Sequence, residues 1–504
     1  MADSSLRSKQ KMRKDQSTIQ HTNNRQPPSR WYFYLGFLVL GIVMLVRNFV
    51  FFQNSAASIT MAKIHSSMDW NALLPLGIID NVNGTSAVKF NNNDNNDQQV
   101  YTVNNTTTKT KTKTTVAYAI TVTNFAGLTT NPEPRKGMIL DRAAVLHQSI
   151  KLAMNTSIRY DYDIHAFVHP EAVEVVPWLK RLGYHVHIKE TPFNITDIQN
   201  PELIAAQNNG CCKEREYLKL YSYLLLDYPV VVHLDLDTLV LKPMDDVFDI
   251  MTDPLYNRIK FKHHSMWKEE EGRNGLVDFV FTRDYNMVDP PKRQPHQIGT
   301  QGGLLVMKPS KEDFDKFVSV ILSGGNYSIG RGWGGELKYG GYYGAGTIQG
   351  LASYYYSHLQ PNRSVELNRC YYNTMVDDPY HNSEKLNRTN MCRTLEPDNT
   401  CQDCQKTSLD EIYTTHLTVC GKPEWCNKPG LLCTKLLIEW HKVRTTLERE
   451  WSERYPIHLY DPKRENITGI SDETTIRQYE GHCTISRKYI PMIFPNVAET
   501  DRLI

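Results

Sequence analysis

Two aspartates two positions apart follow a strongly apolar stretch in the middle of the chain. Asp235 and Asp237 belong to VVVHLDLDTLVLKP, which is otherwise mostly apolar. On a strand, side chains two apart project to the same side, so we expect both carboxylates to face one point. Neighbouring anions repel unless a cation lies between them, and carboxylates suit Mg²⁺ or Mn²⁺. The spacing predicts a divalent-metal site, although Asp-x-Asp alone is a weak pattern and aspartates also cap loops and helices.

The elements around the two aspartates place them at one edge of a sheet. Hydrophobic periods predict, in order, strand 115–124, helix 137–155, strand 163–170, helix 171–183, strand 184–190 and helix 212–228. Such alternation predicts βαβ units and a mostly parallel, doubly wound sheet. The near-continuous apolar run before Asp235 is typical of an inner strand covered on both faces. The carboxyl end of such a strand is where open α/β sheets bind ligands.

Charge and length narrow the classes of function. The chain has 504 residues, with 57 Lys and Arg against 55 Asp and Glu, and a formal net charge of +2. A nucleic-acid partner would call for a concentrated basic patch, which this balance does not indicate. The length allows one large or two ordinary domains with accessory segments.

The N-terminal region predicts a membrane anchor. Residues 1–30 are rich in Lys and Arg and precede the apolar run 31–52, which is long enough to span a bilayer. Basic residues before the run predict a cytosolic tail, a signal-anchor and a lumenal body, in the Golgi or the ER. A cleaved signal peptide is the alternative, because SAAS at 55–58 offers small residues. The Asn- and Thr-rich residues 53–115 predict a disordered stalk.

Sequons and cysteines agree with a lumenal body. Nine N-x-[ST] sequons all lie beyond the apolar run: Asn83, Asn104, Asn105, Asn155, Asn194, Asn326, Asn362, Asn387 and Asn466. Eight of the ten cysteines lie in the last third of the chain: Cys370, Cys392, Cys401, Cys404, Cys420, Cys426, Cys433 and Cys483. An oxidising compartment favours disulfides among them, with no pairing assigned. Zinc is the alternative, because Cys401 and Cys404 have ligand-like spacing near His416.

Several segments together resemble one enzyme family. HLDLDTLVLKPMDDVF, preceded by YLKLYSYLLLDYPVVV, resembles the metal-site segment of the glycogenin-like glycosyltransferases, family eight. TVAYAITVTN, TQGGLLVMKPS, GAGTIQGLASYYY and HLTVCGKPEW resemble, in order, its first strand, its acceptor-side strand, the segment after it and its late histidine motif. The resemblance covers residues 116 to about 428. It implies a GT-A catalytic domain at 116–430. Outside the resemblance, the amphipathic pattern of LLCTKLLIEWHKVRTTLEREW at 431–451 predicts a helical C-terminal extension at 431–504.

The resemblance implies roles for residues that isolated patterns would not assign. Asp235, Asp237 and His416 would bind the divalent ion, Mn²⁺ or Mg²⁺, that bridges the diphosphate of a UDP-sugar. Lys422 would neutralise the β-phosphate and Lys219 would contact the donor. A departing UDP gains negative charge, which a metal and a lysine stabilise. Taken alone, His416 would more often be a satisfied core or surface histidine, and Lys219 a solvated residue on a helix face.

Other candidate residues line the expected substrate region. Gly302 and Gly303 either relieve a strand at a bulge or let a sugar approach the backbone, and the sequence does not separate the two. Trp333, among glycines and near tyrosines, is a candidate for stacking on an acceptor sugar. Gly421, in the late motif, lies closer to Lys422 than the usual spacing of the family would place it.

One departure from the family affects the expected chemistry. Many members have an aspartate immediately before the glutamine of the late segment, whereas this chain has Ile348 before Gln349. Gln349 could instead hold the donor sugar, and the departing phosphate could take the acceptor proton, as the front-face mechanism for retaining transferases supposes. The missing carboxylate also motivates an inactive relative that partners an active transferase.

The interpretation is a membrane-anchored, metal-dependent transferase. It would move a hexose-type sugar from UDP to a hydroxyl of a glycan, protein or lipid, with retention at the anomeric carbon. A lectin-like membrane-anchored binding module is the other alternative, suggested by the aromatic loop around Trp333. The donor sugar depends on a few hydroxyl contacts in the folded pocket, so the sequence does not name it.

Overall fold

The structure is a computed structural model of the chain, and part of the chain is described. The described ranges are 113–123, 133–207, 212–253, 277–287, 298–383, 388–394, 401–427, 430–454, 480–484 and 486–494. The chain divides into two units, Met1–Lys111 and Thr112–Ile504, and every described residue belongs to the second. The predicted tail, anchor and nearly all of the stalk lie outside the described residues and stay predictions. None of the described helices is long and apolar enough to cross a bilayer.

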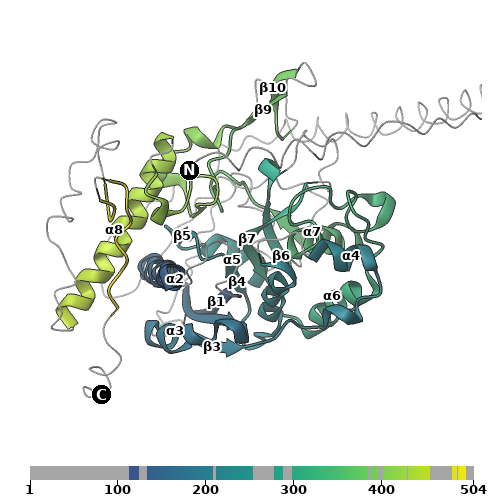
Figure 1. Cartoon of the computed structure of the whole chain (residues 1–504), viewed down its shortest axis with the longest axis horizontal. Helices are drawn as coiled ribbons and strands as arrows, with labels where there is room; N and C mark the ends of the chain where they lie inside the picture. Colours follow the sequence, from purple (N-terminus) through teal and green to yellow (C-terminus); the bar gives the residue numbers. More distant parts are fainter. Residues whose placement is uncertain are drawn as a thin grey trace, which may run out of the picture. The chain divides into compact units, whose positions relative to one another are not determined.

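A seven-stranded sheet forms the centre of the second unit (Figure 1). Its strands are β1 (Thr114–Val122), β2 (Tyr160–Val168), β3 (His185–Ile188), β4 (Val231–Leu234), β6 (Phe279–Arg283), β7 (Thr300–Met307) and β8 (Ser364–Glu366). They lie in the order β3-β2-β1-β4-β7-β6-β8. β7 is antiparallel to both of its neighbours, and the other pairs are parallel. The prediction of an α/β fold with a mostly parallel sheet is confirmed.

Helices cover both faces of this sheet. They are α2 (Glu133–Met154), α3 (Val176–Leu182), α4 (Pro201–Ala206), the 3₁₀ helix η5 (Lys213–Leu224), α5 (Asp245–Thr252), α6 (Lys311–Ser323) and α7 (Ile348–Tyr354). α6 shows why such a segment starts and stops. The side chain of Ser310 accepts a hydrogen bond from the backbone N–H of Asp313, and Gly324 ends the helix in the left-handed region at φ 78°.

Two apolar cores lie on opposite faces of the sheet. Tyr118 of β1 joins the core shared with α2, α3 and α5, whereas its neighbours Ala117 and Ala119 join the core shared with η5, α6 and α7. Adjacent residues of a strand point to opposite faces, so each central strand contributes to both cores. This explains why the apolar run before Asp235 does not alternate with polar residues.

The end of β4 differs from the expectation. β4 ends at Leu234, and Asp235 and Asp237 lie in a turn in which the Thr238 N–H donates to the Asp235 carbonyl at 3.0 Å. The expectation that strand geometry aims both carboxylates is therefore wrong. After the turn, β5 (Thr238–Val240) leaves the large sheet and pairs antiparallel with β11 (Thr414–His416).

The predicted helical extension packs on the same unit. α8 (Leu431–Arg454) lies alongside α2 in Figure 1. Leu436 and Trp440 of α8 join a third apolar core with Ala144 and Val145 of α2. The first part of the extension is therefore a further layer of the fold.

The cysteine-rich region is bonded as the disulfide interpretation predicts. The pairs are Cys370–Cys404, Cys392–Cys401, Cys420–Cys433 and Cys426–Cys483. Cys401 and Cys404 thus belong to two different disulfides, and the zinc alternative at this spacing is wrong because disulfide sulfurs are not available as thiolate ligands. The small hairpin of β9 (Tyr380–Ser383) and β10 (Arg388–Cys392) carries one of these cysteines.

Candidate metal centre

Three potential metal ligands converge beyond the end of β4. One ligand atom each from Asp235, Asp237 and His416 lies within 4.8 Å of the other two. His416 Nε2 is 3.3 Å from Asp237 Oδ2 and 3.8 Å from Asp235 Oδ2. The structure therefore brings together the two carboxylates and the distant imidazole that the sequence singled out.

Backbone pairing explains this convergence. In the β5–β11 register, His416 is the partner of Thr238, the residue that follows Asp237. The Leu417 N–H donates to the Asp237 carbonyl at 2.9 Å, and the Asp235 N–H donates to the Gly303 carbonyl at 3.1 Å. The turn is thus held by β11 on one side and by β7 on the other.

Each carboxylate has a lysine beside it. Lys219 Nζ lies 2.8 Å from Asp235 Oδ1 and 3.0 Å from Glu216 Oε2, and it donates to the Gly302 carbonyl at 3.0 Å. Lys422 Nζ contacts Asp237 Oδ2. Lys219 is only 5% exposed, so it is not a solvated residue on a helix face. Burial alone would lower the pKa of Lys219, but Asp235 and Glu216 outweigh burial and raise it, so the ammonium stays charged.

The two glycines of β7 lie under the side chains of the site. The β6–β7 register shifts between Phe281 and Arg283, opposite these glycines, so the bulge interpretation fits. A Cβ on Gly303 would lie 2.4 Å from His416 Nδ1, and one on Gly302 would lie 3.2 Å from Gln349 Cγ. The groups that approach these glycines closely are side chains of the protein itself. This is a third explanation for glycine at these two positions.

At the start of α7, the neighbouring residues Ile348 and Gln349 lie in two different environments. Ile348 is 2% exposed and belongs to the core of η5, α6 and α7. Gln349 instead lies beside Gly302. A Cβ added to Gly302 would lie 3.6 Å from Gln349 Nε2 and 3.4 Å from Lys219 Nζ. Gln349 therefore borders the site together with Lys219, while Ile348 contributes no polar group.

Trp333 and Gly421 do not join this cluster. Trp333 is 0% exposed, and its Nε1–H donates to the Ala345 carbonyl at 2.7 Å. In this structure, its ring packs in the core and has no open face for a sugar. Gly421 is in the left-handed region at φ 86°, and its Cβ position lies 3.3 Å from Trp425. It allows a turn ahead of Lys422.

Several polar groups around the site, most of them buried, were not predicted from the sequence. Gln301 Oε1 accepts hydrogen bonds from Asn373 Nδ2 at 2.9 Å and from the Gly303 N–H. Asp284 is 4% exposed; burial raises its pKa to about 6, His416 opposes that effect and Asp377 adds to it. Glu216 pairs with Lys219 at the other end. None of these residues stands in a spacing that carries a chemical signal, so the fold was needed to find them.

The donor set fits a divalent cation. Burial lowers the pKa of His416, which favours the neutral imidazole with a lone pair to offer a cation. Its Nδ1 is buried without a hydrogen-bond partner among the described residues, while Nε2 faces both carboxylates. Two carboxylates and one imidazole suit Mn²⁺, and carboxylates with phosphate oxygens suit Mg²⁺.

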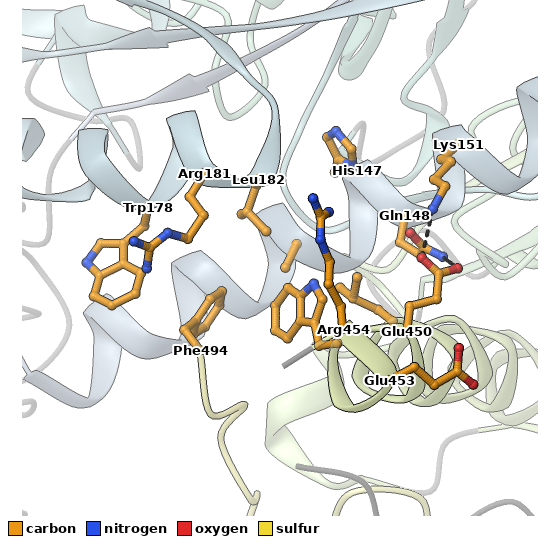
Figure 2. A pocket seen from close by; sticks show the side chains of 13 residues that line it. His147, Gln148, Lys151, Trp178, Arg181, Leu182, Glu450, Glu453, Arg454 and Phe494 are labelled. Atoms are coloured by element: carbon orange, nitrogen blue, oxygen red, sulfur yellow. Dashed lines mark hydrogen bonds and ion pairs between the residues drawn. The ribbon is translucent and has the colours of Figure 1, made fainter. Parts of the chain in front are cut away.

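A separate hollow lies between α2, α3 and α8 (Figure 2). Its volume is about 480 Å³, and its lining includes Trp178, Arg181, Trp451 and Phe494. Glu450 at its rim already binds Lys151 at 2.7 Å and Gln148 at 2.8 Å. None of the metal-centre residues lines it, so this hollow is a different feature of the fold.

Comparisons with known proteins give distant likenesses only. No protein-family model and no curated protein matches the chain. An active-site mutant of LgtC matches with 12% identity and a TM-score of 0.37, over 68% of this chain and 100% of that chain. The galactosyltransferase LgtC with donor and acceptor sugar analogues gives 12% and 0.35, also over 68% of this chain and 100% of that chain. Mouse xyloside xylosyltransferase 1 gives 13% and 0.34, over 61% and 98%.

Proposed function

We propose that this chain is a metal-dependent glycosyltransferase that moves a hexose-type sugar from a UDP-sugar to an acceptor hydroxyl, with retention at the anomeric carbon. The acceptor would be a glycan, a glycoprotein or a glycolipid. The observation that carries the proposal is the convergence of Asp235, Asp237 and His416, with Lys219 and Lys422 beside them, at the carboxyl end of β4. Open α/β sheets bind ligands at such ends.

The residues of the site suit the departure of a diphosphate. A bound Mn²⁺ or Mg²⁺ would neutralise part of the charge that develops on the leaving UDP. Lys422, next to Asp237, would supply a second positive charge to the β-phosphate. Lys219 forms an ion pair of 2.8 Å with Asp235 and would also contact the donor.

Gln349 is the group proposed to orient the donor sugar. Its amide borders Gly302 and offers both a donor and an acceptor to sugar hydroxyls. A neutral amide does not take the proton of the acceptor hydroxyl, so the departing phosphate would take it. The retaining front-face reaction needs no further carboxylate for this step.

A catalytically inactive relative that binds UDP-sugar is the second candidate. It is favoured by one observation, namely that Ile348 is buried in an apolar core where many family-eight members have an aspartate. The site then has the metal ligands without that carboxylate. Such a chain would bind the nucleotide and act as a partner of an active transferase.

We propose that the catalytic unit works in the lumen of the Golgi or the ER, anchored by residues 31–52. Four disulfides among the described residues support an oxidising compartment, because the cytosol keeps thiols reduced. The basic residues before the apolar run support the same orientation.

The test is UDP release by the full-length chain in detergent, against a panel of UDP-sugars with Mn²⁺. The double variant Asp235→Ala, Asp237→Ala is the negative control, and Asp315→Ala, on the exposed side of α6, is the matched surface control. Turnover with one donor that only the double variant loses would establish the transferase. Mn²⁺-dependent UDP binding without turnover on any donor would favour the inactive relative, and glycan binding without nucleotide would favour a lectin.

A further inference from the structure

Three histidines lie together at the edge of the large sheet, away from the metal centre. His165 is on β2, and His185 and His187 are on β3, which is the last strand on its side of the sheet. The β2–β3 register pairs His165 with His185 directly, and His187 is two positions further along the same face. The ring centroid of His165 is 5.1 Å from that of His185 and 5.2 Å from that of His187.

A hydrogen-bond chain fixes which nitrogen of His165 carries its proton. The Tyr228 hydroxyl donates to Asp163 Oδ2 at 2.8 Å, so its oxygen is left to accept from His165 Nε2 at 3.1 Å. His165 therefore has its proton on Nε2 and a lone pair on Nδ1. That Nδ1 lies 2.9 Å from His187 Nε2, which supplies the proton between them. Most metal-binding histidines likewise donate their second ring N–H to a hydrogen-bond partner, as His165 does to Tyr228.

For one pair of rings, His165 and His187, the nitrogen–nitrogen distance is close to that of imidazoles that share one metal ion. Two nitrogens on a tetrahedral Zn²⁺, each about 2.0–2.1 Å from the ion, lie roughly 3.4 Å apart, so His165 and His187 would separate by about half an ångström. His187 would move its proton to Nδ1, which frees Nε2 without any net change in charge. His185 Nε2 lies 3.9 Å from Asp163 Oδ1, and its nitrogens are not grouped with those of His165 and His187 in this structure. To complete the site, the 60% exposed side chain of His185 would have to turn away from Asp163.

We propose that His165, His185 and His187 form a second metal site, which takes a borderline divalent ion such as Zn²⁺. Imidazoles select Zn²⁺, Cu²⁺ or Ni²⁺, whereas the oxygen-rich centre at Asp235 and Asp237 suits Mg²⁺ or Mn²⁺. Tyr228 and Asp163 form the outer shell, and water completes the coordination. The ion would cross-link β2 to the four-residue strand β3 and stabilise the folded chain by mass action.

The experiment is a Zn²⁺ titration of the full-length chain by calorimetry in excess Mg²⁺, on the background Asp235→Ala, Asp237→Ala. That background removes the other centre, so the result does not depend on the proposed transferase activity. We expect one equivalent of Zn²⁺ and a rise in Tm. His165→Gln or His187→Gln should abolish both effects, and Co²⁺ in place of Zn²⁺ should show the visible absorption of a tetrahedral nitrogen site.

Two further variants separate this site from a surface chelate. His185 and His187 alone, two apart on an exposed strand, could bind Zn²⁺ weakly, and His165→Gln would then leave the binding unchanged, which overturns the proposal. Tyr228→Phe keeps the ring and removes the relay, so we expect affinity to fall about 10-fold or more with the fold intact. No Zn²⁺ binding by a chain whose circular dichroism is native would also overturn it.

Discussion

At the scale of single residues, the metal centre is a set of charges that neutralise one another. Lys219 is buried, and its ammonium faces the partly exposed carboxylates of Asp235 and Glu216. Lys422 and His416 face Asp237 from another side. Removing one partner of a buried pair is costly because it leaves an uncompensated charge, so these residues affect folding as well as chemistry.

Gly303→Ala should disrupt the centre while leaving the fold intact. The new Cβ would lie 2.4 Å from His416 Nδ1, so the imidazole would have to move away from the carboxylates. We expect Mn²⁺ affinity, measured by calorimetry, to fall about 10-fold or more. Gly302→Ala is the matched control, because its nearest contact is 3.2 Å from a flexible glutamine carbon. Equal losses in the two variants would show that the strand, and not His416, is what the substitution disturbs.

Asp284→Asn tests the buried carboxyl beside the centre. The pKa of Asp284 is raised from 3.8 to about 6 chiefly by burial, so the folded chain binds more protons than the unfolded chain between these values. The free energy of unfolding should therefore fall as pH rises from about 4 to about 7, by about 3 kcal/mol from this group. The asparagine side chain does not titrate, so the variant should lack this slope and be more stable near pH 7.

The measurement for Asp284 is urea denaturation from pH 4 to pH 8. EDTA is present to remove any cation bound near His416, because its charge would change the pKa of Asp284. Asp315→Asn, on the exposed side of α6, is the control and should keep the slope. A wild-type curve and an Asp284→Asn curve that stay parallel over this range would contradict the raised pKa.

At the scale of elements, a small two-stranded sheet positions the site. β5 and β11 pair over three residues each, and two strands alone are marginally stable. β11 gains support from Thr374, whose carbonyl accepts from the His416 N–H at 2.9 Å and from Thr415 Oγ1 at 2.8 Å. The Cys420–Cys433 disulfide then ties the segment after β11 to the start of α8.

Replacing Cys420 and Cys433 by serine should loosen the segment that carries Lys422. The pair closes a loop with a sequence separation of 13, so its loss should lower the free energy of unfolding by about 3 kcal/mol. Because Lys422 lies inside the loop, we also expect weaker Mn²⁺-dependent UDP binding. The matched control is the double serine variant of Cys392 and Cys401, with a separation of 9 near the β9–β10 hairpin. Weaker UDP binding in the control as well would refute a specific role for this loop.

At the scale of the whole unit, the last described segment, 486–494, packs against α2, an element near the start of the unit. Tyr489 donates to Asp141 Oδ2 of α2 at 2.7 Å and accepts from Arg444 Nη1 of α8 at 2.7 Å. The Met492 N–H donates to the same carboxylate oxygen at 3.0 Å. The segment 486–494 therefore binds α2 and α8 to each other, and the disulfide from Cys483 to Cys426 fixes the segment before it.

Tyr489→Phe should test this closure. The variant keeps the ring on α8 and removes two hydrogen bonds of buried charged groups, so we expect a loss of about 2–3 kcal/mol in the free energy of unfolding. Urea denaturation measures it. Tyr162→Phe on β2 is the matched control, because its hydroxyl has no hydrogen-bond partner in the described part of the chain, and it should change stability by less than about 0.5 kcal/mol. A similar small change in both variants would contradict the proposed contribution of the Tyr489 hydroxyl to holding α2 and α8 together.

Much of the large sheet could be predicted from the sequence because its signal is local. The runs behind β1 and β4 are apolar over a strand length, those behind β2 and β3 alternate apolar and polar residues, and the periods behind α2 and α8 are helical. Each of these elements can therefore be predicted from its own residues. Likewise, Asp235, Asp237 and His416 carry a chemical type that burial in a core would not favour. The reversed direction of β7 has no such local signal.

What the sequence by itself determined is the first strands and helices of the large sheet and the helix at its C-terminal side, which cysteines form disulfides as a group, and that Asp235 and Asp237 suit a metal; His416 joined them only through the family resemblance. The tertiary structure alone decided that Asp235 and Asp237 lie in a turn, that Lys219 is buried between carboxylates and that Trp333 packs in the core. It also placed three histidines of two strands on one face. The physical reason is that hydrophobic period depends on neighbours along the chain, whereas register, burial and charge pairing depend on residues that are distant in sequence.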